Sequence, residues 1–205
     1  MIFGNQSQNN QSGPINLSKG EKISLTKDNP NLKKLRVGLG WDIQRYDGQA
    51  DFDLDASAFL VDANGRCSGL ENFVFYKHLA TSNQSVVHTG DNRTGEGDGD
   101  DEAILIDLTK IPNDIQKIII SVTIDQAQQR GQKFGQVSNA YVRVLNEDSN
   151  SEILRYDLNE DYDRETALVI CEIYKHNSEW KFNAVGSGYH DGLAGICRQV
   201  GLDVC

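Results

Sequence analysis

Apolar and polar residues alternate with a period of two along most of the chain between residues 15 and 187. In the stretch 35–41, for example, Leu35, Val37, Leu39 and Trp41 alternate with arginine or glycine. Because successive side chains of a strand point to opposite faces of a sheet, this period predicts β-strands with one apolar face. The same period predicts further strands in the stretches 54–60, 118–124, 140–145 and 180–185.

Short turn-forming sequences separate these predicted strands. They occur at residues 46–48, 63–65, 111–113, 146–150 and 176–177. Many strands at this spacing, without a regular alternation of strand and helix, favour an all-β fold, an antiparallel β-sandwich. The nearly all-apolar run 168–173 predicts a central strand that is buried on both faces.

One helix is predicted near the end of the chain. Leu193, Ile196, Cys197 and Val200 recur at helical spacing, and Gly201 is a typical stop. We expect this short C-terminal helix to pack on the sandwich.

The domain organisation follows from composition. Residues 1–13 are rich in Asn, Gln, Ser and Gly, which predicts a flexible tail. No linker or internal repeat interrupts the rest, so residues 14–205 are predicted to form a single domain.

The overall charge excludes some partners. The 205 residues include 30 acidic and 20 basic ones, which gives a net charge of −10. Such a chain is a poor non-specific ligand for nucleic acid, and it would need a bridging cation to bind an anionic membrane. No apolar run reaches the roughly 18 residues of a transmembrane segment. The first residues lack the features of a secretory signal, so we expect a cytoplasmic protein.

The four cysteines have no zinc-binding spacing, and in a cytoplasmic chain we expect reduced thiols. Cys171 lies in an apolar run and is predicted to be in the core. A thiol that binds a soft metalloid is a weaker alternative.

The candidate chemistry is concentrated in residues 90–102, GDNRTGEGDGDDE, which contain six carboxylates, one asparagine and four glycines. Oxygen ligands on a glycine-rich backbone suit a hard cation, calcium above all. The spacing differs from that of an EF-hand. The alternative is a solvated acidic loop without a ligand.

A second acidic group precedes one of the predicted strands. Asp53 and Asp55 share a face, while Leu54 points into the core. Since loops gather at the ends of a sandwich, this pair and the acidic loop could converge on one or two cations. Gly38 and Gly40 suggest either close approach of another group or a bulge, and Asp42 follows them. A polar outer face remains the alternative for the Asp53/Asp55 pair.

Signs of catalysis are few. The Asp-x-Asp pair precedes its apolar run and the sheet is predicted to be antiparallel, unlike the arrangement in phosphatases that form an aspartyl-phosphate. The chain has four scattered histidines and no Walker-type loop or recognisable nucleophile motif. His88 is next to the acidic loop, and we expect it to be structural.

Five segments together resemble the tellurium-resistance TerD family of stress-response and chemical-damage-resistance proteins. They are residues 37–42 (VGLGWD), 51–57 (DFDLDAS), 90–102, 134–138 (FGQVS) and 179–182 (EWKF). The resemblance covers roughly residues 15–200. It implies a calcium-binding β-sandwich in the bacterial cytoplasm, encoded among genes for resistance to tellurite, phage and some toxins.

The resemblance also implies ligands and partners. The expected Ca²⁺ ligands are Asp53, Asp55, Asp91, Asn92, Glu96, Asp98, Asp100, Asp101 and Glu102. Asp42 and Glu172 are weaker candidates. The expected partners are other stress-response or tellurium-resistance proteins, near the inner membrane.

The sequence leaves three functions open. The first is a non-enzymatic calcium-binding scaffold. The second is a metal-dependent enzyme that acts on a phosphorylated or oxidised substrate. The third is calcium-bridged binding to anionic lipid, for which only Arg93 offers support.

Overall fold

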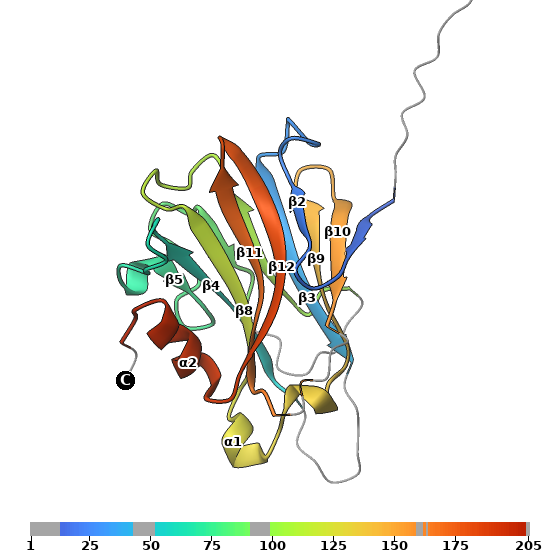
Figure 1. Ribbon diagram of the computed structural model, residues 1–205, viewed down its shortest axis with the longest axis vertical. Coiled ribbons are helices and arrows are strands. Elements are labelled where there is room, and N and C mark those ends of the chain that lie inside the picture. Colours follow the sequence, from blue (N-terminus) through green and yellow to red (C-terminus); the bar gives the residue numbers. More distant parts are fainter. Residues whose placement is uncertain (1–12, 43–51, 91–98, 159–161, 163, 204–205) are drawn as a thin grey trace, which may run out of the picture.

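The computed structural model describes residues 13–42, 52–90, 99–158, 162 and 164–203. Two β-sheets stack face to face, and the short C-terminal helix packs on the outer side of one of them (Figure 1). The predicted antiparallel β-sandwich with a short C-terminal helix is therefore confirmed.

The first sheet has six strands in the described residues. They are β1 (Ile15–Leu17), β3 (Lys34–Asp42), β6 (Val86–His88), β7 (Glu102–Asp107), β9 (Ser138–Asn146) and β10 (Ser151–Asp157). Their order across the sheet is β1-β10-β9-β3-β7-β6. β1 pairs with β10 in parallel, and the other neighbours are antiparallel.

The second sheet also has six strands in the described residues. They are β2 (Lys22–Ser24), β4 (Leu54–Val61), β5 (Phe73–Val74), β8 (Lys117–Ile124), β11 (Ala167–His176) and β12 (Glu179–Tyr189). Their order is β2-β12-β11-β8-β4-β5, with every pair antiparallel. Two helices, α1 (Ala127–Arg130) and α2 (Gly192–Gln199), and two 3-10 turns, η1 (Leu70–Asn72) and η2 (Phe134–Gln136), complete the described elements.

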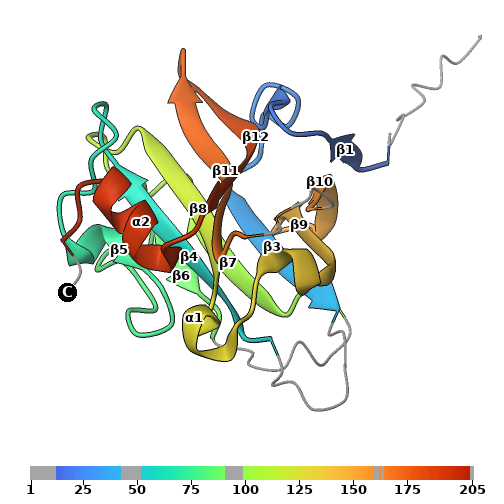
Figure 2. The same cartoon turned by 60° about the horizontal axis from the view of Figure 1, so that its bottom comes forward.

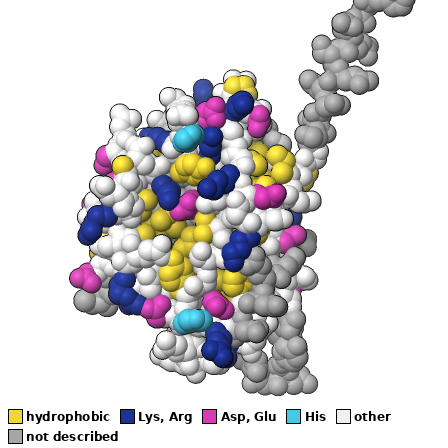
Figure 3. All heavy atoms as spheres, in the orientation of Figure 1, with side chains coloured by type: hydrophobic (Ala, Val, Ile, Leu, Met, Phe, Trp, Pro, Cys, Tyr) yellow, Lys and Arg dark blue, Asp and Glu magenta, His cyan; other side chains and the backbone are white. Residues whose placement is uncertain are grey.

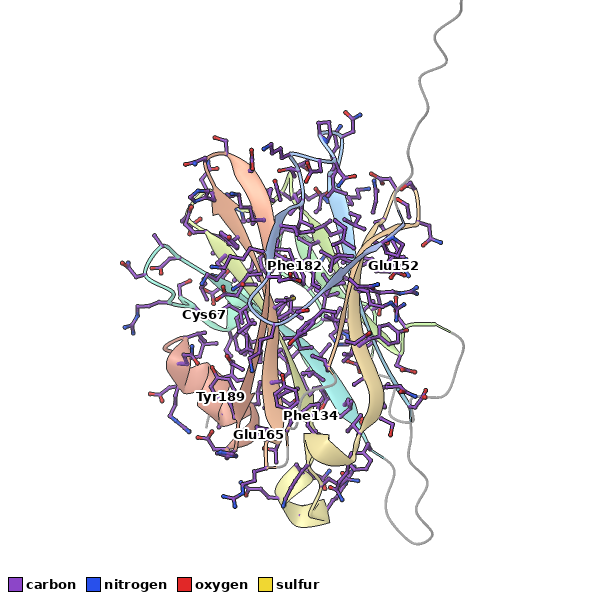
Figure 4. The ribbon with its side chains drawn as sticks, turned by 45° about the vertical axis from the view of Figure 1, so that its right-hand side comes forward. Cys67, Phe134, Glu152, Glu165, Phe182 and Tyr189 are labelled. Carbon is purple, nitrogen blue, oxygen red and sulfur yellow. The ribbon has the colours of Figure 1, made fainter. Side chains whose placement is uncertain are left out.

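The main core lies between the sheets and follows the predicted alternation. Leu35, Val37, Leu39 and Trp41 of β3 are all buried there. They meet the inward side chains of the second sheet, among them Phe182 of β12, which Figure 4 shows between the layers. The apolar stripe that predicted each strand is thus the stripe that it buries.

A second, smaller core lies on the outer side of the second sheet, under α2. Ile196 and Cys197 of α2 pack there with Phe59 and Val61 of β4. Gly201 follows the helix with φ +75°, the left-handed conformation expected of a glycine stop. β11 is consequently covered on both faces, by the main core and by this cluster, as its apolar run predicted.

Candidate functional site

Several strand ends that carry acidic residues meet at one end of the sandwich, which Figure 2 turns toward the viewer. β3 ends there with Asp42, and β7 starts there with Glu102. β4 starts at the same end, since Leu54 pairs with Ile124, the last residue of β8. The antiparallel topology therefore places Asp53, Asp100 and Asp101 at one end of the molecule.

Asp100 lies over β3 on the outer face of the first sheet. A Cβ atom on Gly38 would lie 2.1 Å from Oδ2 of Asp100, so only glycine leaves room for this carboxylate. Nε of Arg143 donates to Oδ1 of Asp100 at 2.7 Å. The close approach predicted at Gly38 is thus real, and the approaching group is a side-chain carboxylate.

Gly40 is covered in a similar way. Its Cβ position would collide with the ring of Tyr141, whose hydroxyl donates to the carbonyl oxygen of Gly99 at 3.0 Å. The pairing of β3 with β9 also shifts between Gly40 and Asp42. Both interpretations of the glycine pair, close approach and bulge, therefore hold at this strand end.

Asp101 turns toward other carboxylates. Its backbone N–H donates to the carbonyl oxygen of Leu39 at 2.8 Å, and its Oδ2 accepts from the N–H of Trp41 at 2.9 Å. Partial burial raises the pKa of the Asp101 carboxyl above its ordinary value, the Trp41 N–H lowers it, and the charges of Asp100, Asp42 and Glu102 raise it further. Negative charge is consequently concentrated around Asp101.

Glu102 points between the two sheets. Its Oε2 accepts from the N–H of Ala56 on β4 at 2.6 Å. The same oxygen lies 3.3 Å from Nε2 of His88, and both side chains are fully buried. Nδ1 of His88 accepts from the N–H of Gly90 at 3.1 Å, so in a neutral ring the proton is on Nε2, facing Glu102. Glu102 and His88 thereby tie both ends of the acidic loop into the sandwich, as expected of a structural histidine.

Asp55 lies elsewhere. Its neighbours on β4, Leu54 and Ala56, belong to the main core, so Asp55 faces the outer side of the second sheet. The N–H of Asp125 donates to the carbonyl oxygen of Asp53 at 2.8 Å, which extends the pairing of β4 with β8 to Asp53. Asp53 and Asp55 thus share the outer face, as the alternation predicted.

The structure brings some of the predicted ligands together and separates others. Asp100, Asp101 and Glu102 neighbour one another and Asp42, whereas Asp55 lies on the opposite outer face of the sandwich. In the described part of the chain no three His, Cys, Asp or Glu side chains form a metal-binding group. The predicted ligands Asp91, Asn92, Glu96 and Asp98 lie outside the described residues.

The two weaker candidates for calcium ligands, Asp42 and Glu172, lie in different parts of the molecule. Asp42 lies by Asp101 and accepts from Nδ2 of Asn139 at 2.6 Å. Glu172 is on β11, where its Oε1 accepts from Nζ of Lys117 at 2.7 Å. It belongs to an ion pair on the second sheet rather than to the acidic end.

Sequence reasoning missed the arginines that face the acidic residues. Arg143 of β9 contacts both Asp100 and Glu152, and Arg155 of β10 contacts Glu152. Figure 4 shows Glu152 on the side of the first sheet that faces away from Phe182. The polar phase of the alternation in β9 placed Arg143 on this outer face, but nothing in the sequence indicated its partner.

The thiols offer little for a metalloid. Burial raises the pKa of Cys67 and of Cys197 to about 11, so both stay protonated at neutral pH. Cys171 is buried in the core as predicted. Because the thiolate is the reactive form, these three cysteines are poorly suited to binding tellurium compounds in the folded state.

The comparisons with known proteins decide the family. The TerD domain matches residues 14–200. The chain belongs to the TerD family. It is 60% identical over 190 residues to the uncharacterized protein YceE of Bacillus subtilis, covering 93% of this chain and 99% of that protein. It is 55% identical over 189 residues to the tellurium resistance protein TerD of Serratia marcescens, covering 92% of this chain and 98% of the relative.

A further relative is named as a general stress protein. General stress protein 16U of Bacillus subtilis is 55% identical over 190 residues, covering 93% of this chain and 98% of that protein. These two named relatives of the TerD-family chain thus carry the names of tellurium resistance and of stress, and neither name is that of an enzyme.

A solved TerD-family structure supports the fold. The homologue of telluride resistance protein from Streptomyces coelicolor superposes with a TM-score of 0.64 at 23% identity, over 81% of this chain and 95% of the other. Identity this low shows the shared β-sandwich alone. Among the described residues, no helix is long and apolar enough to cross a membrane.

Proposed function

We propose that this TerD-family protein is a calcium-binding module of the stress response. The observation that carries the proposal is the concentration of carboxylates around Asp101. Partial burial and three neighbouring carboxylates raise the pKa of Asp101, and a bound cation would relieve that repulsion. Carboxylate oxygens are also the ligands that calcium prefers, so the donor set fits the ion.

The described residues divide into ligand candidates and supports. Asp101 would hold the ion together with the predicted loop ligands, whereas Asp100 already pairs with Arg143 and Asp53 shares the outer face of the second sheet with Asp55. Glu102 is enclosed between the sheets, so we assign it the role of anchoring the loop. Calcium would supply a double positive charge and the six to eight coordination positions that can join separate loops.

The tellurium-resistance and stress relatives support a scaffold that assembles partners rather than a catalyst. An enzyme would need a general acid or base beside the metal. His88 is next to the acidic loop, and its side chain is fully buried between the sheets. The proposed partners remain other stress-response proteins at the inner membrane of a bacterial cell.

Calcium titration tests the proposal. Calorimetry should give a Kd of about 10⁻⁷ to 10⁻⁵ M for calcium, with magnesium much weaker because a crowded carboxylate site suits the larger ion. Asp101→Asn should weaken calcium binding. Asp114→Asn is the matched control, because Asp114 is exposed in the turn before β8, at the opposite end of the sandwich. Absent heat with calcium, or equal loss in both variants, would refute the site.

The scaffold role needs a cellular test. Cells that lack the native gene would receive the wild type, Asp101→Asn or Asp114→Asn and be challenged with tellurite. Resistance should fail only with Asp101→Asn, and a calcium-dependent pull-down should lose its partners in the same variant. Full resistance with Asp101→Asn, after calorimetry has shown that calcium binding is lost, would separate calcium from the function.

A further inference from the structure

Arg143 brings a positive charge to the acidic end from the outer face of the first sheet. Its Nε donates to Oδ1 of Asp100 at 2.7 Å, and its Nη1 donates to Oε2 of Glu152 at 3.2 Å. Glu152 has a second arginine, because Nε of Arg155 donates to its Oε1 at 3.1 Å. Asp100 forms an ion pair with no other lysine or arginine in the described part of the chain. Within the described fold, Asp100 therefore depends on Arg143 for its counter-ion.

The carboxylate of Asp100 is enclosed by protein. Its side chain is 8% exposed and that of Arg143 is 23% exposed. Oδ2 occupies the space that Gly38 leaves open, where a Cβ atom would overlap it. The lysine and arginine side chains that Figure 3 shows over the face of the second sheet are instead dispersed on the surface. Since salt screens a partly buried pair less than an exposed one, Arg143 is a fixed counter-ion of Asp100.

A tyrosine on the same strand holds the backbone of the segment. Tyr141 and Arg143 are two residues apart on β9, so both point to the outer face. The Tyr141 hydroxyl donates to the carbonyl oxygen of Gly99 at 3.0 Å, and the guanidinium of Arg155 lies 4.1 Å from the centre of its ring. The segment is thus fixed both at the backbone of Gly99 and at the side chain of Asp100.

The pair of Arg143 and Asp100 adjoins the proposed calcium site. Asp101 is the next residue in the chain, but its Oδ2 accepts from the backbone N–H of Trp41 at 2.9 Å. Consecutive carboxylates are therefore held by different strands, the first by β9 and the second by β3. A calcium ion at Asp101 would have to compete with the guanidinium of Arg143 for the oxygens of Asp100, because both are cations that bind carboxylate oxygen.

From this geometry we propose that Arg143 is an internal counter-ion that keeps Asp100 out of the calcium ligand set and thereby limits the affinity of the site. The inference rests on the proposed function, since it concerns the calcium site at Asp101. Arg143 acts through Asp100 and is a positioning residue. The site consequently responds to higher calcium concentrations than its number of carboxylates suggests.

Calcium calorimetry on variants of the full chain tests this role. Arg143→Gln should tighten calcium binding by about tenfold, the size of one charged hydrogen bond, because the carboxylate of Asp100 can then bind the ion. Arg143→Lys keeps the charge and should stay close to the wild type. Arg36→Gln is the control on the same face. It removes an arginine that pairs with Glu147 and leaves the Asp100 pair intact, so its effect should be much smaller.

A double-mutant cycle shows whether Arg143 acts through Asp100. Asp100→Asn should weaken calcium binding by about tenfold in the Arg143→Gln background and much less in the wild type. In the wild type, the NMR signal of the Arg143 Nε–H, assigned by its loss in Arg143→Lys, should keep its hydrogen-bonded shift when calcium is added. This measurement is decisive even if Arg143→Gln does not fold.

The outcomes separate this inference from the proposed function. Additive effects in the cycle, weaker calcium binding by Arg143→Gln, or loss of the Nε–H bond at saturating calcium would overturn the role of Arg143 alone. Absence of calcium heat from both the wild type and Arg143→Gln would overturn the calcium module together with it.

Discussion

Asp100 and Asp101 are neighbours in the chain, yet they lie in opposite electrostatic surroundings. Asp100 turns to the outer face of the first sheet, where Arg143 pairs with it at 2.7 Å. Asp101 turns to the strand end, where the neighbouring charges that act on its pKa are those of three carboxylates. The fold balances the charge of Asp100 with its own arginine, whereas burial and neighbouring carboxylates raise the pKa of Asp101. Counting carboxylates in the sequence cannot tell these two situations apart.

The largest expected effect concerns the anchor beside this pair. Glu102→Ala should cost about 3–5 kcal/mol of unfolding free energy, because it leaves the buried N–H of Ala56 without its acceptor and opens a cavity where a fully buried side chain was. Urea unfolding at saturating calcium measures this loss. Glu147→Ala, which breaks the partly exposed pair with Arg36 at 2.7 Å, is the control and should cost about 1 kcal/mol or less. Similar losses in both variants would remove the anchoring role.

Calcium removal addresses Asp101 directly. A ligand that binds only the native state at one hundred times its Kd adds about 2.7 kcal/mol, so a chelator should lower the Tm by the corresponding amount. Asp101→Asn should already have lost most of this response, because it removes charge from the proposed site. A wild-type Tm that ignores the chelator would contradict a structural calcium ion.

A substitution at Gly38 tests the position of Asp100 on the outer face of the first sheet. Gly38→Ala should cost about 1–3 kcal/mol, the usual penalty of overpacking, since the new Cβ would overlap the carboxylate of Asp100. Adding Asp100→Ala should recover part of that loss, and a double-mutant cycle measures the coupling. Additive losses would show that Asp100 does not lie over Gly38.

The smallest expected effect is that of a second carboxylate paired with an arginine on the outer face of the first sheet, Glu147. The hydrogen bond from Arg36 lowers the pKa of Glu147 below its ordinary value of 4.5. The pair therefore stabilises the protein above that pH, and the contribution is lost as pH falls through the lowered pKa. Arg36→Gln should cost about 1 kcal/mol or less at neutral pH, and the difference from wild type should shrink in acid. Thermal unfolding across pH checks both points.

Much of the fold could be predicted because each strand buries the stripe that its sequence displays. The alternation around Val37 and the helical spacing of Ile196 are local patterns, and both elements formed where expected. The site was harder because its geometry depends on pairing between distant segments. The alternation correctly predicts that residues 53 and 55 share a face of their strand. Only the tertiary structure shows that Asp55 lies on the outer face of the second sheet, away from the acidic loop.

The same limit explains Glu102 and Ser57. Glu102 looks like one more loop carboxylate in the sequence, yet it begins β7 and points inward to Ala56 of the other sheet. Ser57 looks like an ordinary polar position in the sequence, and only the structure shows that its Oγ is buried without a hydrogen-bond partner among the described residues. Such roles follow from tertiary partners, which no local pattern encodes.

The bond from Ala56 to Glu102 also bears on how an edge of the second sheet is protected. β5 covers β4 only at Ala58 and Phe59, so the Ala56 N–H lies along a margin where another polypeptide could add as an extra strand. The carboxylate of Glu102 occupies that donor from the opposite layer at 2.6 Å. A side chain first noticed as a potential ion ligand therefore also guards the molecule against edge-to-edge aggregation.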